Sequence, residues 1–120
     1  FERKRPRYVT NIHVQPVFAG SPCDTAEKYV RAFVDANSWA DQSGGLYRRL
    51  GPTVRTMRDG KYQYAWTALR GEGGSQEWAA LSDGKRVCSF HISYPLEYAE
   101  DHQALLAVIS SFEFVEGTPR

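Results

Sequence analysis

The chain has 120 residues, of which 15 are Lys or Arg and 14 are Asp or Glu, so its formal net charge is +1. Three Trp, seven Tyr and six Phe make 13% of it aromatic, which excludes a largely disordered chain. No run of 18 apolar residues occurs, so we predict one folded domain without a membrane-spanning helix.

Basic residues are concentrated at the N-terminus. Four of residues 3–7 are Arg or Lys, whereas eleven basic and thirteen acidic residues lie beyond residue 7. A basic arm can contact nucleic acid or anionic lipid, but four charges are few and the rest of the chain is slightly acidic. We therefore predict no nucleic-acid partner, a solvated tether over residues 1–7, a single domain over 8–116 and a tail over 117–120.

The first strand is predicted over residues 8–18, where the residues on one face of an extended chain alternate with those on the other. Pro16 lacks a backbone N–H group, so it indicates that this strand lies at a sheet edge or ends there. One face of the predicted strand carries Tyr8, Thr10, Ile12 and Val14.

A first helix is predicted next, ending near Asn37. Ser21 and Pro22 are typical of an N-cap and of the first helical position. Asp24 with Glu27 offers an alternative capping box one turn later. The apolar residues that follow have the spacing of one buried helical stripe, formed by Ala26, Tyr29, Val30, Phe33 and Val34.

A run of strands follows the helix. Asp-Gly pairs at 59–60 and 83–84 are typical of hairpin turns, because those positions require a positive φ angle. In the last strand of the run, alternation places Cys88 on an apolar face. The predicted strands cover residues 46–50, 53–58, 61–70, 76–81 and 85–94.

A second helix is predicted over residues 98–111, with a short strand over 112–115. Hairpins in sequence, with helices separated from them, are typical of the α+β class. We therefore expect an antiparallel sheet of about five to six strands, flanked by two helices that cover its apolar residues.

Cys23 and Cys88 are the two cysteines of the chain. They form either a disulfide or two buried free thiols, because neither has a neighbour at zinc-ligand spacing. An even number in a small domain favours a disulfide and an oxidising compartment. We therefore predict a periplasmic or exported protein, which contacts a membrane only through a removed N-terminal signal or lipid anchor. Free thiols would instead fit a cytoplasmic protein.

Sequence motifs for catalysis are absent. The chain has no phosphate-binding glycine fingerprint and no nucleophile elbow. The carboxylate pairs Glu72 with Glu77, and Glu97 with Asp101, are expected at the surface. We predict no metal, no cofactor, no catalytic residue and no enzymatic activity. Three histidines are expected to be ordinary surface or half-buried residues: His13, His91 and His102.

Aromatic and basic residues gather between positions 48 and 78. They are either core residues or an exposed surface, and Trp, Tyr and Arg are the residue types that dominate binding hot spots. On the second interpretation, a basic face of this kind attracts an acidic partner. The predicted partner-binding residues are Arg48, Arg49, Arg55, Arg58, Lys61, Tyr62, Tyr64, Trp66, Arg70 and Trp78.

NIHVQPV precedes the helix of SPCDTAEKYVRAFV, DG-linked hairpins follow, and in HQALLAVISSFEF a helix runs into a Phe-x-Phe strand. This order of elements resembles the PsbP-like superfamily, which includes the bacterial DcrB proteins. The resemblance covers roughly residues 8–115. It implies a PsbP-like fold and a non-enzymatic binding protein, since members are effector chaperones, exported lipoproteins or assembly factors.

We therefore expect a small bacterial protein-binding module. Its most concrete form is a periplasmic immunity protein that neutralises a secreted toxic effector. The first alternative is an intracellular chaperone or adaptor of a type VI secretion effector, and the second is a small enzyme of unknown reaction. The sequence names no partner and no oligomeric state.

Overall fold

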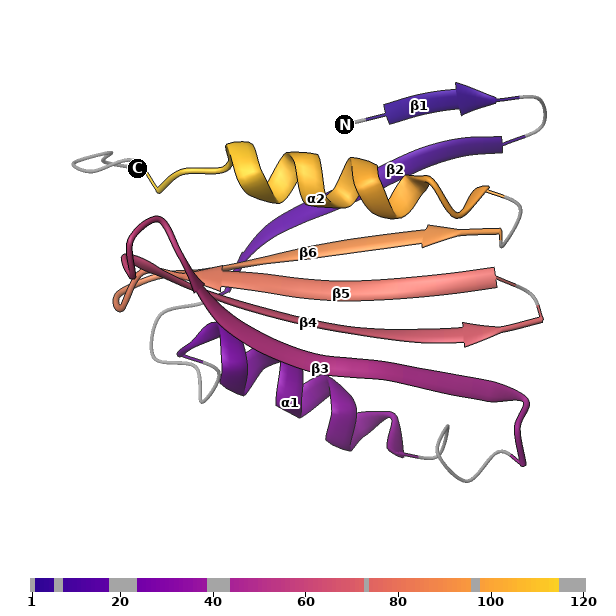
Figure 1. The fold of residues 1–120 in the computed structure, drawn as a ribbon, viewed down its shortest axis with the longest axis horizontal. Helices are drawn as coiled ribbons and strands as arrows, with labels where there is room; N and C mark the ends of the chain where they lie inside the picture. The colour runs from indigo at the N-terminus through magenta and orange to yellow at the C-terminus, as the bar shows by residue number, and fades with distance from the viewer. Residues whose placement is uncertain are drawn as a thin grey trace.

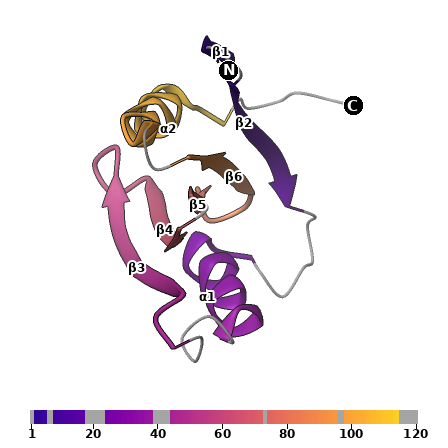
Figure 2. The same ribbon diagram turned by 90° about the vertical axis from the view of Figure 1, so that its right-hand side faces the viewer.

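Six strands form one antiparallel sheet in the order β1-β2-β6-β5-β4-β3, and one helix lies on each face (Figure 1, Figure 2). This arrangement confirms the predicted α+β class. The computed structural model describes residues 2–5, 8–17, 24–38, 44–72, 74–95 and 98–114. The elements are β1 (Glu2–Arg5), β2 (Tyr8–Val17), α1 (Ala26–Ala36), β3 (Tyr47–Met57), β4 (Tyr62–Gly71), β5 (Gly74–Ser82), β6 (Val87–Tyr94) and α2 (Asp101–Ser111).

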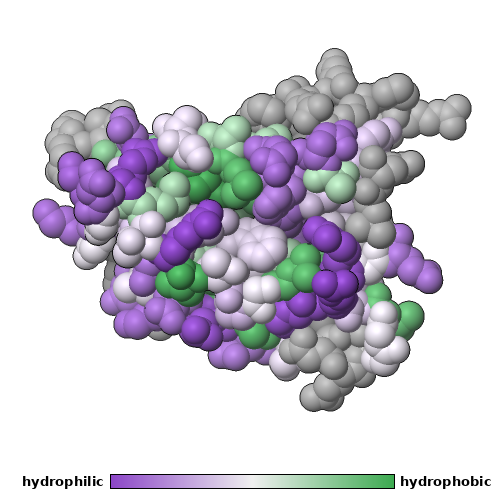
Figure 3. All heavy atoms as spheres, viewed as in Figure 1, coloured by the Kyte–Doolittle hydropathy of each residue, from purple (hydrophilic) through white to green (hydrophobic). Residues whose placement is uncertain are grey.

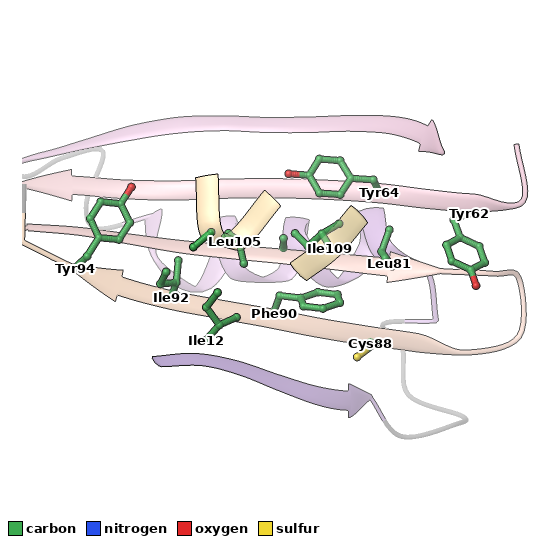
Figure 4. Close-up of a cluster of buried hydrophobic side chains, with 12 residues drawn as sticks. Ile12, Tyr62, Tyr64, Leu81, Cys88, Phe90, Ile92, Tyr94, Leu105 and Ile109 are labelled. Carbon is green, nitrogen blue, oxygen red and sulfur yellow. The ribbon is translucent and has the colours of Figure 1, made fainter. Parts of the chain in front are cut away.

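The main core lies between the sheet and α2. Alternation along β6 directs Phe90 and Ile92 to this side, and neither side chain is exposed to solvent. They pack against Leu105 and Ile109, which lie on the side of α2 that faces the sheet (Figure 4). A second, smaller core on the opposite face is formed by Ala26, Val30, Ala65, Ala80 and Val87.

The start of α1 is determined by contacts with the sheet. The first free N–H groups of a helix need acceptors outside it. Thr25 is the N-cap and accepts from the Lys28 amide, instead of the predicted alternative Asp24, while Ser21 and Pro22 lie outside the described residues. The Ala26 amide donates to Ser82 Oγ at 2.9 Å, and the Glu27 amide donates to a side chain of β4. Because these acceptors come from the sheet, local sequence signals alone did not locate the helix start.

Strand β3 replaces the two strands predicted over 46–50 and 53–58. The pairing with β4 shifts register between Leu50 and Thr53, so the strand continues through an irregularity. Gly51 occupies this place with a φ angle of 79°, and a Cβ atom there would lie 2.9 Å from the carbonyl oxygen of Trp66. The Gly-Pro pair therefore marks a bulge in an edge strand rather than a strand end.

The N-terminal segment differs from the predicted tether. Residues 2–5 form β1, which pairs antiparallel with the first part of β2. The pairing with β6 begins only at Ile12 of β2. Pro16 therefore lies in the part of β2 that β1 does not cover, which agrees with the edge position that its missing N–H group predicted.

No strand is formed at residues 112–114, the described part of the strand predicted over 112–115. The Phe114 amide instead donates to the hydroxyl group of Tyr62 at 2.9 Å. Phe112 packs edge-on against Phe90, with ring centroids 5.3 Å apart. Phe112 and Phe114 therefore pack against the main core without forming a strand. Within the described residues, neither helix has the length and apolarity needed to cross a membrane.

Cys88 is a buried free thiol, so the predicted disulfide has no support. Cys23 lies outside the described residues. The predicted disulfide assumed that the first helix packs on the same face of the sheet as Cys88, but the two helices lie on opposite faces. Cys88 belongs to the core beneath α2 (Figure 4), whereas α1, the helix that follows Cys23 in the chain, packs on the opposite face.

Cys88 should resist alkylation in the folded protein. Burial raises the pKa of its thiol to about 11, so little thiolate exists at mildly alkaline pH. Iodoacetamide followed by peptide mass spectrometry should leave Cys88 unmodified before unfolding and modified after unfolding without a reductant. Modification that requires a reductant would reveal a disulfide and contradict the structure.

Candidate functional site

A buried carboxylate lies at the centre of the α2 face of the sheet. Glu77 on β5 is fully buried, at 0% exposure. Its Oε1 atom accepts from Trp66 Nε1 at 2.7 Å and lies 2.6 Å from His102 Nδ1. Its Oε2 atom accepts from the hydroxyl group of Tyr94. Three donors from β4, β6 and α2 thus converge on one side chain.

The regular fold brings these donors together. Glu77 is paired with Ala68 of β4 and Ile92 of β6, at the middle of the sheet. His102 lies in the first turn of α2, one turn before Leu105, so it faces the sheet with the apolar stripe. The network therefore connects α2 to three strands, and hydrogen bonds compensate for the burial of the carboxylate.

His102 is the part of this network that reaches solvent. Its side chain is 31% exposed, and its ring packs edge-on against Trp66 with centroids 5.9 Å apart. Nδ1 lies against Glu77 and therefore carries a proton. The other ring nitrogen, Nε2, has no partner among the described residues.

A cavity of about 270 Å³ opens beside His102, between β3, β4 and α2. The guanidinium group of Arg55 lies 4.9 Å from the centroid of the Tyr64 ring. Such cation–π packing orients the guanidinium group without neutralising its charge. The cavity is lined by Thr53, Arg55, Tyr64, Trp66, His102 and Leu106.

The hydroxyl groups of Tyr64 and Tyr94 should resist ionisation. Burial is the main cause that raises the pKa of each to about 12. The nearby Glu77 carboxylate acts in the same direction, and the positive charge of Arg55 partly opposes the rise at Tyr64. Because the folded state favours the protonated phenol, this contribution to stability is complete below about pH 10 and is lost as pH rises towards about 12.

A UV titration of phenolate absorbance measures this effect. The folded wild-type protein should show a late component, which Tyr64→Phe and Tyr94→Phe each reduce. Exposed Tyr47→Phe is the control and should leave the late component in place. An unchanged late component in both core variants would contradict the assignment.

The predicted aromatic surface is divided between core and the two faces of the sheet. Tyr62 and Tyr64 are buried beneath α2, and Trp66 is half-buried beside Glu77. Trp78 lies on the opposite face, where it stacks on Phe33 of α1 at 5.3 Å. The sequence left open whether these residues form core or surface, and the structure assigns most of them to the core.

Trp78 also stacks on His91, with ring centroids 5.4 Å apart. Burial, together with the nearby His13, lowers the pKa of His91. A cavity of about 520 Å³ lies beside this row of rings, and Leu46 and Tyr47 contribute to its wall. The aromatic residues on this face therefore border a second opening at the end of α1.

Two of the predicted basic residues stabilise helix ends. Arg58 Nη2 donates to the carbonyl oxygens of Ser110 and Phe112, at 2.6 Å each, where α2 ends. Arg49 donates to the carbonyl oxygen of Asn37 at 2.8 Å, where α1 ends. Cations at helix C-termini are favourable because the exposed carbonyl groups carry partial negative charge.

The other predicted basic residues are Arg48, Arg55, Lys61 and Arg70. Arg48 and Arg55 are exposed on β3, and Lys61 is exposed in the turn that follows. Arg70 is half-buried on β4, where its Nε atom donates to Ser75 Oγ at 3.5 Å. β3 also exposes Tyr47 and Val54. On the side of the molecule drawn in Figure 3, small groups of hydrophobic residues lie among hydrophilic ones.

Sequence reasoning missed Glu77 and His102. Glu77 was expected at the surface, yet alternation places it on the same side of the strand as Ala79 and Leu81, two apolar core residues. Helical periodicity places His102 on the same side of α2 as Leu105 and Ile109. An ionisable residue on the apolar side of each element was the sequence feature that could have indicated the site. In the described part of the chain, no group of three His, Cys, Asp or Glu side chains could hold a metal ion.

The fold and the site together define an α+β domain with a buried carboxylate network and an exposed basic edge strand. No protein-family model, no curated protein and no solved structure matches the chain. The PsbP-like resemblance therefore remains a prediction.

Proposed function

We propose that the protein is a non-enzymatic protein-binding module whose β3 edge receives an acidic, extended segment of another protein. The observation that carries the proposal is the exposure of β3. None of its eleven residues is buried, and among the described residues no strand pairs with its outer edge. Exposed edge strands present unpaired backbone groups to which a partner strand can add.

Charge supports an acidic partner. The sequence of β3 contains three Arg and no Asp or Glu. Among the described residues, Arg48 and Arg55 form no ion pair, whereas Arg49 is held by α1. Charges of one sign at an interface accelerate association with a partner of the opposite sign. Val54, at 37% exposure, adds an apolar contact in the same strand.

A secreted toxic effector is the most concrete partner of this kind, and the protein would then act as its immunity protein in the periplasm. An intracellular chaperone of such an effector would use the same edge. Both are roles of a non-enzymatic binding protein, which the PsbP-like resemblance of the sequence implies. Suppression of the effector's activity would favour immunity, and a higher soluble yield of the effector would favour a chaperone.

Charge and apolar substitutions on β3 test the proposal. Arg48→Glu and Val54→Asp should each weaken capture of a partner at least tenfold, about 1.4 kcal/mol, measured by quantitative pull-down. Lys85→Glu in the β5–β6 turn and Val14→Asp on β2 are matched controls, because both residues are exposed away from β3. Equal capture by all four variants would exclude the β3 edge.

A further inference from the structure

We infer that the cavity between β3, β4 and α2 binds the phosphate group of a small phosphate monoester, with Arg55 and His102 as its binding residues. The cavity shares β3 with the proposed function, because Arg55 lines the cavity and also belongs to the basic edge strand, whereas Arg48 and Val54 do not line the cavity. The phosphate site rests on three observations: an unneutralised arginine, a histidine held in one orientation by a buried carboxylate, and an open volume between them.

Arg55 supplies the positive charge. Its guanidinium group packs over the Tyr64 ring, which holds it at the cavity. It forms no ion pair with any described residue. A guanidinium group in this state retains its donors, and its planar fork matches the oxygens of phosphate.

His102 supplies a second contact of fixed direction. Because Nδ1 lies 2.6 Å from Glu77, the ring orientation is set by a side chain that is itself fully buried and bonded to Trp66. Nε2 can accept from a ligand hydroxyl when the ring is neutral and donate to a ligand oxygen when it is protonated. A phosphate monoester offers both groups near its second pKa of about 6, and acceptor oxygens alone at higher pH.

The burial of Glu77 also points to a role beyond packing. Apolar residues of similar volume often stabilise a core as well as a buried charged pair does. Here the carboxylate keeps the histidine oriented at the wall of a cavity, as buried carboxylates do for functional histidines.

The volume and lining of the cavity restrict the size and the chemical groups of the ligand. The volume of about 270 Å³ accommodates a phosphate group with a small organic part. Trp66 and Leu106 provide an apolar side, and Thr53 and Tyr64 bring hydroxyl groups. The raised pKa of Tyr64 keeps its hydroxyl protonated and able to donate. These features favour a phosphate ester over a bare ion.

NMR titration of the ¹⁵N-labelled protein with phenyl phosphate tests the inference. We expect saturable shifts of the Trp66 indole and Arg55 Nε–H signals. Arg55→Gln and His102→Gln should each weaken binding at least tenfold. Glutamine at 102 can still donate to Glu77, so this variant should remain folded. Arg31→Gln on α1 is the control, because Arg31 is exposed on the opposite face of the sheet. This variant should bind phenyl phosphate as tightly as the wild-type protein does.

Two further probes define what the cavity recognises. Phenol, which lacks the phosphate, should leave the same signals unshifted, and inorganic phosphate should bind more weakly than phenyl phosphate. Equal binding of phenol, or unchanged binding by Arg55→Gln, would overturn the phosphate site. Equal affinity for inorganic phosphate would overturn the monoester assignment. Arg48→Glu and Val54→Asp leave this cavity intact, so the two proposals fail independently.

Discussion

Replacing Glu77 with alanine should lower the free energy of unfolding by about 3–5 kcal/mol, the range for breaking a buried charged network. The substitution removes the acceptor of three donors, on Trp66, Tyr94 and His102. Each buried donor left without a partner costs about 1–3 kcal/mol. Domains of this size are stable by about 5–15 kcal/mol, so the variant should lie close to its unfolding limit.

Urea denaturation followed by tryptophan fluorescence measures this loss. Glu77→Gln should lose only about 1 kcal/mol, because its amide oxygen can accept from Trp66 and His102 while its NH₂ group donates to the Tyr94 hydroxyl. Gln76→Ala, on the exposed face of the same strand, should change stability by at most about 0.5 kcal/mol. Equal losses for Glu77→Ala and Glu77→Gln would contradict the role assigned to the hydrogen bonds.

Replacing Arg58 with alanine should lower the free energy of unfolding by about 2 kcal/mol. Arg58 donates two short hydrogen bonds to the carbonyl groups at the end of α2, and its guanidinium group lies 5.2 Å from the centroid of the Tyr62 ring. Hydrogen bonds to charged groups contribute about 1.5–3 kcal/mol. Partial exposure, at 27% of the side chain, reduces the sum of the two.

Hydrogen exchange locates this effect. The amides in the last turn of α2 should exchange faster in Arg58→Ala, while those of α1 should be unchanged. Lys61→Ala is the matched control, since Lys61 is an exposed cation in the same turn whose side chain forms no ion pair with the described residues. A loss of stability in Lys61→Ala equal to that in Arg58→Ala would show that net charge, rather than the helix end, is responsible.

Most of the strands and both helices followed from local patterns, because alternation and helical periodicity depend only on neighbouring residues. The strand predicted over 61–70 is found as β4, and both Asp-Gly hairpins form. The Thr25 cap was missed because its neighbouring helix amides find acceptors on Ser82 and Gln63. The start of α1 therefore depends on contacts between segments that are distant in the sequence, which local patterns do not reveal.

The candidate site was harder to predict for the same reason. Arg58 was assigned to a binding surface because its sequence neighbours are basic and aromatic, but its acceptors lie more than 50 residues away in the chain. Glu77 and His102 are likewise 25 residues apart and meet only after α2 docks on the sheet. Cys88 was paired with Cys23 because the sequence does not specify which face of the sheet each helix covers.

The strand order has a consequence for synthesis of the chain. Strands β3 to β6 pair with their neighbours in sequence, but β2 pairs with β6, whose partner residues lie 70 to 80 positions further along. At about 5–20 residues per second, β2 leaves the ribosome roughly 4–15 s before that partner has been made. During this interval β2 has β1 as a neighbour, but Ile12, which is buried in the finished core, still lacks β6 and α2, which form the rest of that core. The nascent N-terminal third therefore depends on solubility supplied by its polar neighbours or by a chaperone until β6 emerges.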